Sequence, residues 1–216
     1  MKTVLGLAAV TLLAQPAFAQ DYEPRDYGAD REVEYVEVLP RSGLRIEGKA
    51  YWESVSDPEE DIGVVYEFGD GFGYGVEAGF DIAAGSRLAI GPYASFQFDG
   101  ASREESDVYV ATKKYFSAGL HAGLATGSNS QVYAKIGYAE LTTEFVVPLF
   151  DPNTNTDVLV AGEDTSEGYE IGLGYEQGFG SNLYGRVGVD IGQTSDFLET
   201  FDLQRVTLGV ALGARL

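Results

Sequence analysis

From Gly43 onward, apolar residues recur at every second position within several separate segments of the chain, which is the period of a β-strand. Between Phe72 and Ile82, for example, the even positions are apolar, whereas the odd positions hold Gly, Glu and Asp. The pattern predicts eight strands, most of them with the roughly 9–12 residues that a tilted strand needs to cross a bilayer. They are 44–52, 72–82, 88–98, 114–124, 132–138, 168–179, 183–192 and 206–216.

One face of each predicted strand is apolar, and the other face carries glycine and charge. Six basic and six acidic residues share the polar faces with His121, and we call this set the lumen network: Arg45, Glu47, Lys49, Glu77, Asp81, His121, Lys135, Glu170, Glu176, Arg186, Asp190, Arg205 and Arg215. Buried charges need partners, and equal numbers of the two signs suit a self-neutralising interior. A soluble sandwich or a lipocalin-like barrel would have the opposite arrangement, with bulky aliphatics inside and polar residues outside. We therefore predict an all-β fold, an eight-stranded antiparallel up-and-down transmembrane β-barrel.

The connections between the predicted strands alternate in length. Three are tight (83–86, 126–130 and 180–182), whereas four are long (53–71, 99–112, 140–166 and 193–202). Short periplasmic turns and long extracellular loops are typical of outer-membrane barrels. The segment 62–68 also has strand character, and we interpret it as an extension of the second strand above the membrane, with a ninth strand as the alternative.

Outward aromatic residues are expected to gather at two levels. The outer belt would hold Trp52, Phe72, Tyr74, Phe96, Phe98, Phe116, Tyr138 and Tyr169. A sparser inner belt would hold Phe80, Tyr175 and Phe179. Such belts lie at the interfaces between the bilayer and water.

The N-terminus has the features of an export signal. Lys2, an apolar run from Val4 to Leu13 and the sequence Ala17-Phe18-Ala19 predict a signal peptide over 1–19. Residues 20–42 are acidic and contain Pro24 and Pro40, which predicts a flexible periplasmic leader before the barrel of 43–216. The absence of cysteine excludes a disulfide framework.

Net charge narrows the possible partners. Of the charged residues, 1–19 contains only Lys2, so the rest of the chain has 13 basic and 34 acidic residues. Nucleic-acid binding requires clustered Lys and Arg, and we expect no nucleic-acid partner. Because the lumen network is balanced, the surplus of acid must lie largely in the external loops, the turns and the leader.

Few residues indicate nucleotide binding, catalysis or metal binding. The glycines at 172, 174 and 178 are followed by another strand and not by a helix, so they do not form a nucleotide loop. His121 is the single histidine and faces the lumen; a lipid-modifying role is a minor alternative, and we predict no catalytic residue and no cofactor.

The loop segment Asp151, Asn153, Asn155 and Asp157 resembles the start of a calcium loop, but Thr156 and Gly162 occupy the positions where such a loop needs Gly and Glu. It is therefore only a weak calcium candidate.

The chain resembles the small outer-membrane β-barrels of Gram-negative bacteria, the porin-family or OmpA-like and opacity-like barrels. The resemblance rests on 70–93 (DGFGYGVEAGFDIAAGSRLAIGPY), 115–139 (YFSAGLHAGLATGSNSQVYAKIGYA) and 205–216 (RVTLGVALGARL). It implies localisation in the outer membrane, contact with outer-membrane lipid, and insertion by the barrel-assembly machinery, which recognises a C-terminal strand such as 206–216. Family members typically end in an aromatic residue, whereas this chain ends in Leu216.

These observations together predict a non-enzymatic outer-membrane barrel. Its role would be envelope integrity or surface interaction through acidic external loops, with an extracellular ligand that the sequence does not identify. A narrow porin for small solutes is the alternative, and a lipid-modifying enzyme is a weaker one.

Overall fold

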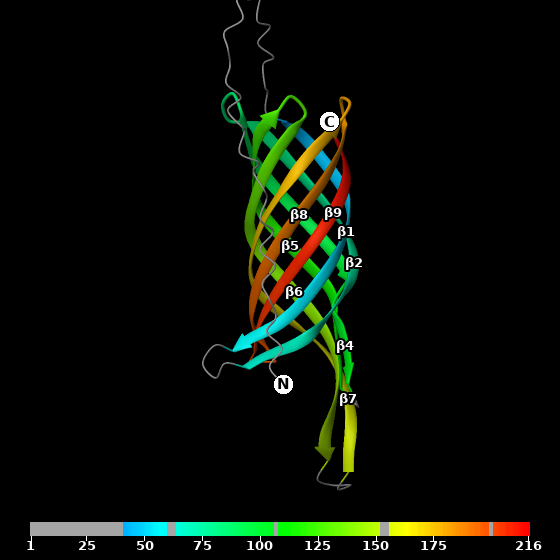
Figure 1. Cartoon of the computed structure of the whole chain (residues 1–216). Helices are drawn as coiled ribbons and strands as arrows, with labels where there is room; N and C mark the ends of the chain where they lie inside the picture. Colours follow the sequence, from blue (N-terminus) through cyan, green and yellow to red (C-terminus); the bar gives the residue numbers. More distant parts are fainter. Residues whose placement is uncertain (1–40, 60–63, 106–107, 152–155, 199–200) are drawn as a thin grey trace, which may run out of the picture. The chain divides into compact units, whose positions relative to one another are not determined.

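A computed structural model describes residues 41–59, 64–105, 108–151, 156–198 and 201–216 (Figure 1). Within these ranges the chain forms nine antiparallel β-strands. They are β1 (Gly43–Glu59), β2 (Val64–Ala83), β3 (Leu88–Asp99), β4 (Ser102–Glu105), β5 (Val108–Gly127), β6 (Ser130–Asp151), β7 (Thr156–Phe179), β8 (Leu183–Phe197) and β9 (Phe201–Arg215). No helix in the described ranges is long and apolar enough to cross a bilayer.

Eight of the strands close into a ring. Neighbours pair in the order β1, β2, β3, β5, β6, β7, β8 and β9, and β1 also pairs with β9 from Arg45↔Arg215 to Ser56↔Gln204. Closure satisfies the backbone N–H and C=O groups within the wall, which a lipid environment requires. The prediction of an eight-stranded up-and-down barrel is confirmed. The short β4 lies outside the ring and pairs with the beginning of β5.

The two faces of the wall have the predicted, inverted polarity. Phe72 is 81% exposed and Leu212 is 73% exposed, although both are large and apolar. Arg45 and Glu170 are fully buried inside the ring. Exposure of so continuous an apolar surface to water is unfavourable, whereas contact with the hydrocarbon core of a bilayer is favourable.

The two ends of the barrel differ. Residues 84–87, 128–129 and 180–182 form short connections at the same end as Leu216, which we call the turn end (Figure 1). Gly180 there has a positive φ of 79°, a conformation that favours glycine in a tight turn. At the opposite end the strands run on past the ring, and β6 and β7 continue furthest as a hairpin (Figure 1).

The long connections are therefore shorter, and the strands longer, than the sequence predicts. Residues 140–151 and 156–166 belong to β6 and β7 and stay paired without a break in register. The segment 64–68 is part of β2 and pairs with β1, as the interpretation of 62–68 as a strand extension requires, while 62 and 63 lie outside the described residues. We call β4, 108–112 of β5, 140–151 of β6 and 156–167 of β7 the extension.

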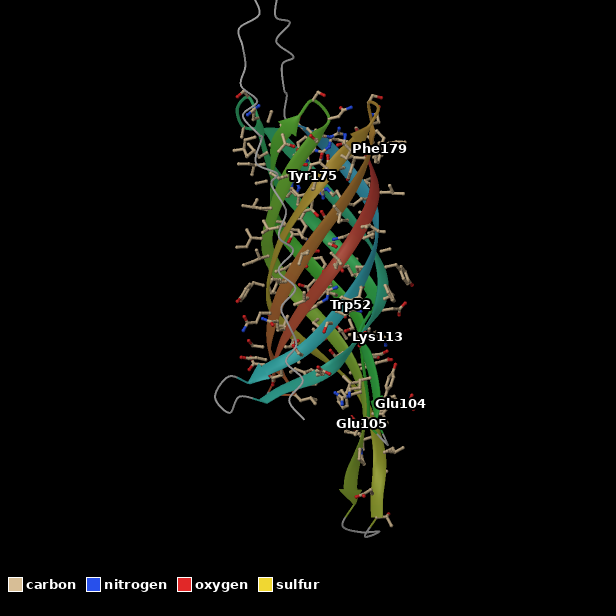
Figure 2. The ribbon with its side chains drawn as sticks, viewed as in Figure 1. Trp52, Glu104, Glu105, Lys113, Tyr175 and Phe179 are labelled. Carbon is tan, nitrogen blue, oxygen red and sulfur yellow. The ribbon has the colours of Figure 1, made fainter. Side chains whose placement is uncertain are left out.

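Aromatic residues lie outward toward both ends of the ring. Tyr175 and Phe179 lie near the turn end, whereas Trp52 lies toward the extension (Figure 2). Trp52, Tyr175 and Phe179 are 37%, 40% and 57% exposed. The extension then continues past Trp52, and Glu104 and Glu105 lie on it (Figure 2).

Glycine on the inner face provides room for the side chains that fill the barrel. A Cβ atom on Gly79 would lie 2.7 Å from Nη2 of Arg45, whereas a Cβ on the outward Gly48 would meet nothing within 4 Å. We expect Gly79→Val to lower the stability by roughly 1–3 kcal/mol, as overpacking does. Gly48→Val should change it by less than about 0.5 kcal/mol. The temperature at which the SDS gel mobility shifts measures both, and equal effects would contradict the inward orientation of Gly79.

Candidate functional site

The charges near the turn end form one connected cluster. Arg45 donates to Oε1 of Glu77 at 2.5 Å and to Oδ2 of Asp81 at 3.1 Å. Arg215 donates to the same Asp81 oxygen at 2.7 Å and to Glu176 at 3.0 Å. These side chains come from β1, β2, β7 and β9, so the cluster ties both sides of the ring together.

His121 lies fully buried in this cluster. Its Nδ1 is 3.1 Å from Oδ1 of Asp81, and its Nε2 is 2.8 Å from Nη2 of Arg186. Arginine only donates hydrogen bonds, so Nε2 accepts and Nδ1 carries the proton toward Asp81. Arg186 also stacks 4.3 Å from the centre of the Tyr133 ring. Both ring nitrogens of His121 are thus used in packing the interior.

A second cluster lies around Lys135 in the middle of the barrel. Its Nζ is 2.8 Å from Oε1 of Glu170 and 3.0 Å from Oδ2 of Asp190. Lys49 approaches Glu77 at 3.2 Å, which links this cluster to the one at the turn end. Ser117 and Tyr93 also donate to Glu170.

Arg205 forms the cluster nearest the extension. It donates to Oε2 of Glu53 at 2.6 Å and to Oε1 of Gln97 at 2.8 Å, and it stacks 3.9 Å from the centre of the Tyr115 ring. Glu53 is fully buried, whereas the hydrophobic pattern predicts a connection over 53–71. Its position one residue beyond the alternating segment 44–52, with the same parity as Glu47, was the signal that could have found it.

Arg41 adds a further interior cation from outside the predicted barrel. Its Nε is 2.9 Å from Oε1 of Glu176, and Arg215 donates to its carbonyl oxygen at 2.6 Å. Gly178 leaves room for it, since a Cβ there would lie 1.8 Å from Nη1 of Arg41. Arg41 lies two residues before the alternating pattern begins, so periodicity could not assign its direction.

The ion-paired side chains of the interior are electrically balanced. The structure places the twelve charged members of the lumen network inside the ring, and Arg41 and Glu53 bring the ion-paired set to seven basic and seven acidic described residues. Asp57 of β1 is also buried and is not part of this set. Each residue of the set has an oppositely charged partner within 4.0 Å. Removal of one partner would leave an uncompensated buried charge and would strongly lower the stability of the barrel.

An apolar cluster closes the interior at the extension end, and we call it the interior seal. It is formed by Val55, Ala101, Tyr115, Ala139, Leu141, Phe197 and Leu203, with Phe68 and Phe145 packed against it. The rings of Phe68 and Phe197 meet edge to face at 5.7 Å. The cavity among these side chains measures about 10 Å³, which is the volume needed for a single water molecule. The described interior is thus filled by paired charges at the turn end and in the middle of the barrel, and by apolar side chains at the extension end.

The outside of the extension is acidic. Its described acids include Glu104, Glu105, Glu144, Glu163, Asp164 and Glu167. Lys113 pairs with Glu163, and Arg103 pairs with Glu105 at 2.5 Å. Tyr109 donates to Glu144 at 3.3 Å, and partial burial together with this carboxylate raises the pKa of Tyr109 above its ordinary value.

Part of one edge of the extension has no strand partner within the described residues. The pairing of β7 with β8 begins at Glu167↔Ser195, so 157–163 have a described strand only on the β6 side, while the backbone N–H of Leu198 donates to the side chain of Asp164. Val158, Leu159 and Val160 are 46%, 59% and 39% exposed on this segment. The β7 edge therefore presents backbone hydrogen-bonding groups beside apolar side chains.

The weak calcium candidate falls mostly outside the described residues. Asn153 and Asn155 are not described, nor is the side chain of Asp151, whereas Asp157 is exposed on β7. Among the side chains that are described, no group of three or more His, Asp or Glu residues could hold a metal ion.

Comparison with known proteins identifies the fold. No protein-family model and no curated protein sequence matches the chain. One solved structure that matches is Ail, the attachment invasion locus protein of Yersinia pestis, in complex with the heparin analogue sucrose octasulfate. The match has a TM-score of 0.52 and 13% identity, and it covers 81% of this chain and 99% of Ail. Neisserial surface protein A matches with a TM-score of 0.51 and 16% identity over 81% of this chain and 98% of its own. The chain has the fold of the small Gram-negative outer-membrane β-barrels.

The balance of the interior gives a direct test. Glu77 lies within 3.6 Å of Arg45, Lys49, Lys135 and Arg186, and it is 2% exposed. We expect Glu77→Gln to lower the free energy of unfolding by roughly 3–5 kcal/mol, because it leaves these cations short of one charge. Glu163→Gln, which breaks the exposed pair with Lys113, should lower it by less than about 1 kcal/mol. Urea unfolding in lipid vesicles measures both, and similar losses would contradict a buried, coupled network.

Proposed function

We propose that the protein is a non-enzymatic outer-membrane barrel that interacts with other proteins through the extension. Residues 1–19 would direct export as a signal peptide, 20–42 would form the periplasmic leader, and the barrel-assembly machinery would insert the barrel from its C-terminal strand β9. Lipid of the outer membrane would cover the apolar wall. With the turn end in the periplasm, the extension would project from the cell surface.

The sealed interior is the observation that favours a surface role over a porin. Solutes would have to pass the salt-bridged clusters around Arg45 and Lys135 and then the interior seal, where the cavity holds about 10 Å³. His121 also supports a non-enzymatic role, because Asp81 and Arg186 occupy both of its ring nitrogens inside the wall.

The β7 edge is the part of the extension best suited to a partner. An extended polypeptide can add to an unpaired strand, with main-chain hydrogen bonds for affinity and side-chain contacts for selectivity. Exposed edges are usually protected by proline, lysine or a bulge. On the β6 side of the same hairpin Pro148 lacks an N–H donor, whereas 156–163 of β7 contain no proline or lysine and keep an unbroken register with β6.

Charge indicates the kind of segment that would pair there. Asp157, Glu163 and Asp164 flank or follow the apolar run 158–162 on β7. A partner strand that alternates apolar and basic residues would match both features. A polyanion such as the heparin analogue bound to Ail would be repelled by this surface.

A synthetic peptide tests the edge. We expect a ten-residue peptide of alternating Lys and Val to bind the full chain in lipid vesicles, and a Glu–Val peptide of the same length not to bind. Val160→Lys should weaken binding of the Lys–Val peptide roughly tenfold, because it removes an apolar contact and places a like charge beside the lysines of the peptide. Ser102→Lys, on the exposed strand β4, makes the same change in charge and should have a smaller effect. Equal losses in the two variants would show that only net charge matters and would contradict strand addition.

Planar-bilayer recording tests the alternative of a porin. The filled interior predicts no stable single-channel steps for the full chain, whereas a reproducible conductance would contradict the sealed interior and support a pore.

A further inference from the structure

We infer that a groove on the outside of the wall binds the phosphate headgroup of an anionic membrane lipid through Lys114; this rests on the proposed position of the barrel in a membrane. The groove measures about 300 Å³. Its aromatic lining comes from Phe96 and Phe98 of β3 and Phe116 of β5, and its far wall from Glu140 and Thr142 of β6. We call it the Lys114 groove.

The aromatic side of the groove suits an acyl chain. Phe96 and Phe98 are 51% and 40% exposed, and the rings of Phe96 and Phe116 lie 4.8 Å apart. Phe98 also contacts Tyr74 of β2 with ring centres 5.8 Å apart. These rings extend the apolar wall without a break, so lipid is the environment they meet first.

Lys114 supplies the charge that the groove needs for a phosphate. It pairs with Phe98 on one side and Thr142 on the other in the strand register, and its side chain is exposed. Arg103 and Lys113, the other exposed bases described at this end of the molecule, each pair with a glutamate. Lys114 has no carboxylate within ion-pair distance among the described residues, so its ammonium is available to an outside anion.

The height of Lys114 on the wall matches that of a headgroup. Lys113, the preceding residue, lies close to the level of Trp52 at the outer aromatic belt (Figure 2). At such an interface a lysine can extend its ammonium to the headgroup layer while its carbon chain stays on the apolar wall. A phosphate on Lys114 would thus leave the acyl chain of the same lipid against Phe96 and Phe116.

Removal of Glu140 is expected to change lipid binding in the opposite direction from removal of Lys114. It lines the same groove, and its Oε1 accepts a hydrogen bond from Tyr138 at 2.8 Å. Its negative charge opposes a phosphate, so its removal should strengthen binding, whereas removal of Lys114 should weaken it.

Lipid retention measured by native mass spectrometry tests the site. The full chain is reconstituted with phosphatidylglycerol or with phosphatidylcholine of the same acyl chains. We expect Lys114→Gln to lower retention of phosphatidylglycerol about fivefold, which corresponds to the roughly 1 kcal/mol that one basic residue contributes near a membrane surface. Lys114→Arg should leave the retention of phosphatidylglycerol unchanged, and Glu140→Gln should increase it. The retention of phosphatidylcholine should change little in all three variants.

Two controls separate the groove from general effects. Arg87, in a short connection at the turn end, is also exposed and has no carboxylate partner among the described residues, and Arg87→Gln makes the same change in charge away from the aromatic rings. Phe116→Ala should reduce retention of both lipids, because it removes apolar contact and no charge. Inorganic phosphate should not displace the lipid; displacement would show that the site takes a free anion and would overturn the lipid assignment.

The outcomes also distinguish the site from the proposed function. Unchanged retention in Lys114→Gln, or an equal loss in Arg87→Gln, would overturn the Lys114 groove while leaving the barrel intact. Loss of the heat-dependent shift in gel mobility in the unaltered chain would instead contradict the membrane barrel itself.

Discussion

The inverted polarity of the wall is the constraint on which the rest of this structure depends. An apolar exterior directs most charged side chains of the wall inward, where water is scarce and an unpaired charge strongly destabilises the fold. The interior meets this requirement with seven acids and seven bases that are ion-paired among the described residues, contributed by Arg41 and by β1, β2, β6, β7, β8 and β9. Glycines such as Gly79 and Gly178 follow from the same constraint, since long charged side chains need room opposite them.

Period-two alternation predicted the ring because it is strongest where one face meets lipid and the other meets the interior. The eight strands, their faces and the outward aromatic residues all lie in such segments. The alternation disappears in 145–150 (FVVPLF) and 158–162 (VLVAG). Val158, Leu159, Val160 and Ala161 are all exposed, so both faces of this part of β7 lie uncovered. A strand exposed on both faces has no reason to alternate, so its sequence does not predict a strand.

The lumen network could be predicted as a set, but its pairing could not. Parity fixes which side chains point inward, whereas the register between distant strands decides that His121 meets Asp81 and Arg186, or that Arg205 meets Glu53. Arg41 shows the limit most clearly, because a residue before the first strand enters the interior by tertiary contact alone. The interior seal likewise depends on Phe68, Phe197 and Leu203, which converge from outside the predicted strands.

Because the interior is filled, partners are expected to bind to the outside of the molecule. The extension provides an unpaired strand edge in an acidic surface, and the Lys114 groove provides a cation beside aromatic rings. The two features lie on different surfaces and would meet different partners, a polypeptide above the membrane and a lipid at its interface. In both, the chemistry lies on strands that the closed ring holds in place.

The single tryptophan of the chain, Trp52, offers the most direct test of the inverted wall. The full chain is reconstituted in vesicles whose lipids carry bromine at defined depths, and the quenching of its fluorescence is measured. An outward Trp52 at the outer belt predicts strong quenching by bromine at shallow acyl positions and weaker quenching near the bilayer centre. Absence of quenching by any brominated lipid, together with full quenching by aqueous iodide, would contradict a membrane-spanning barrel with its apolar face outside.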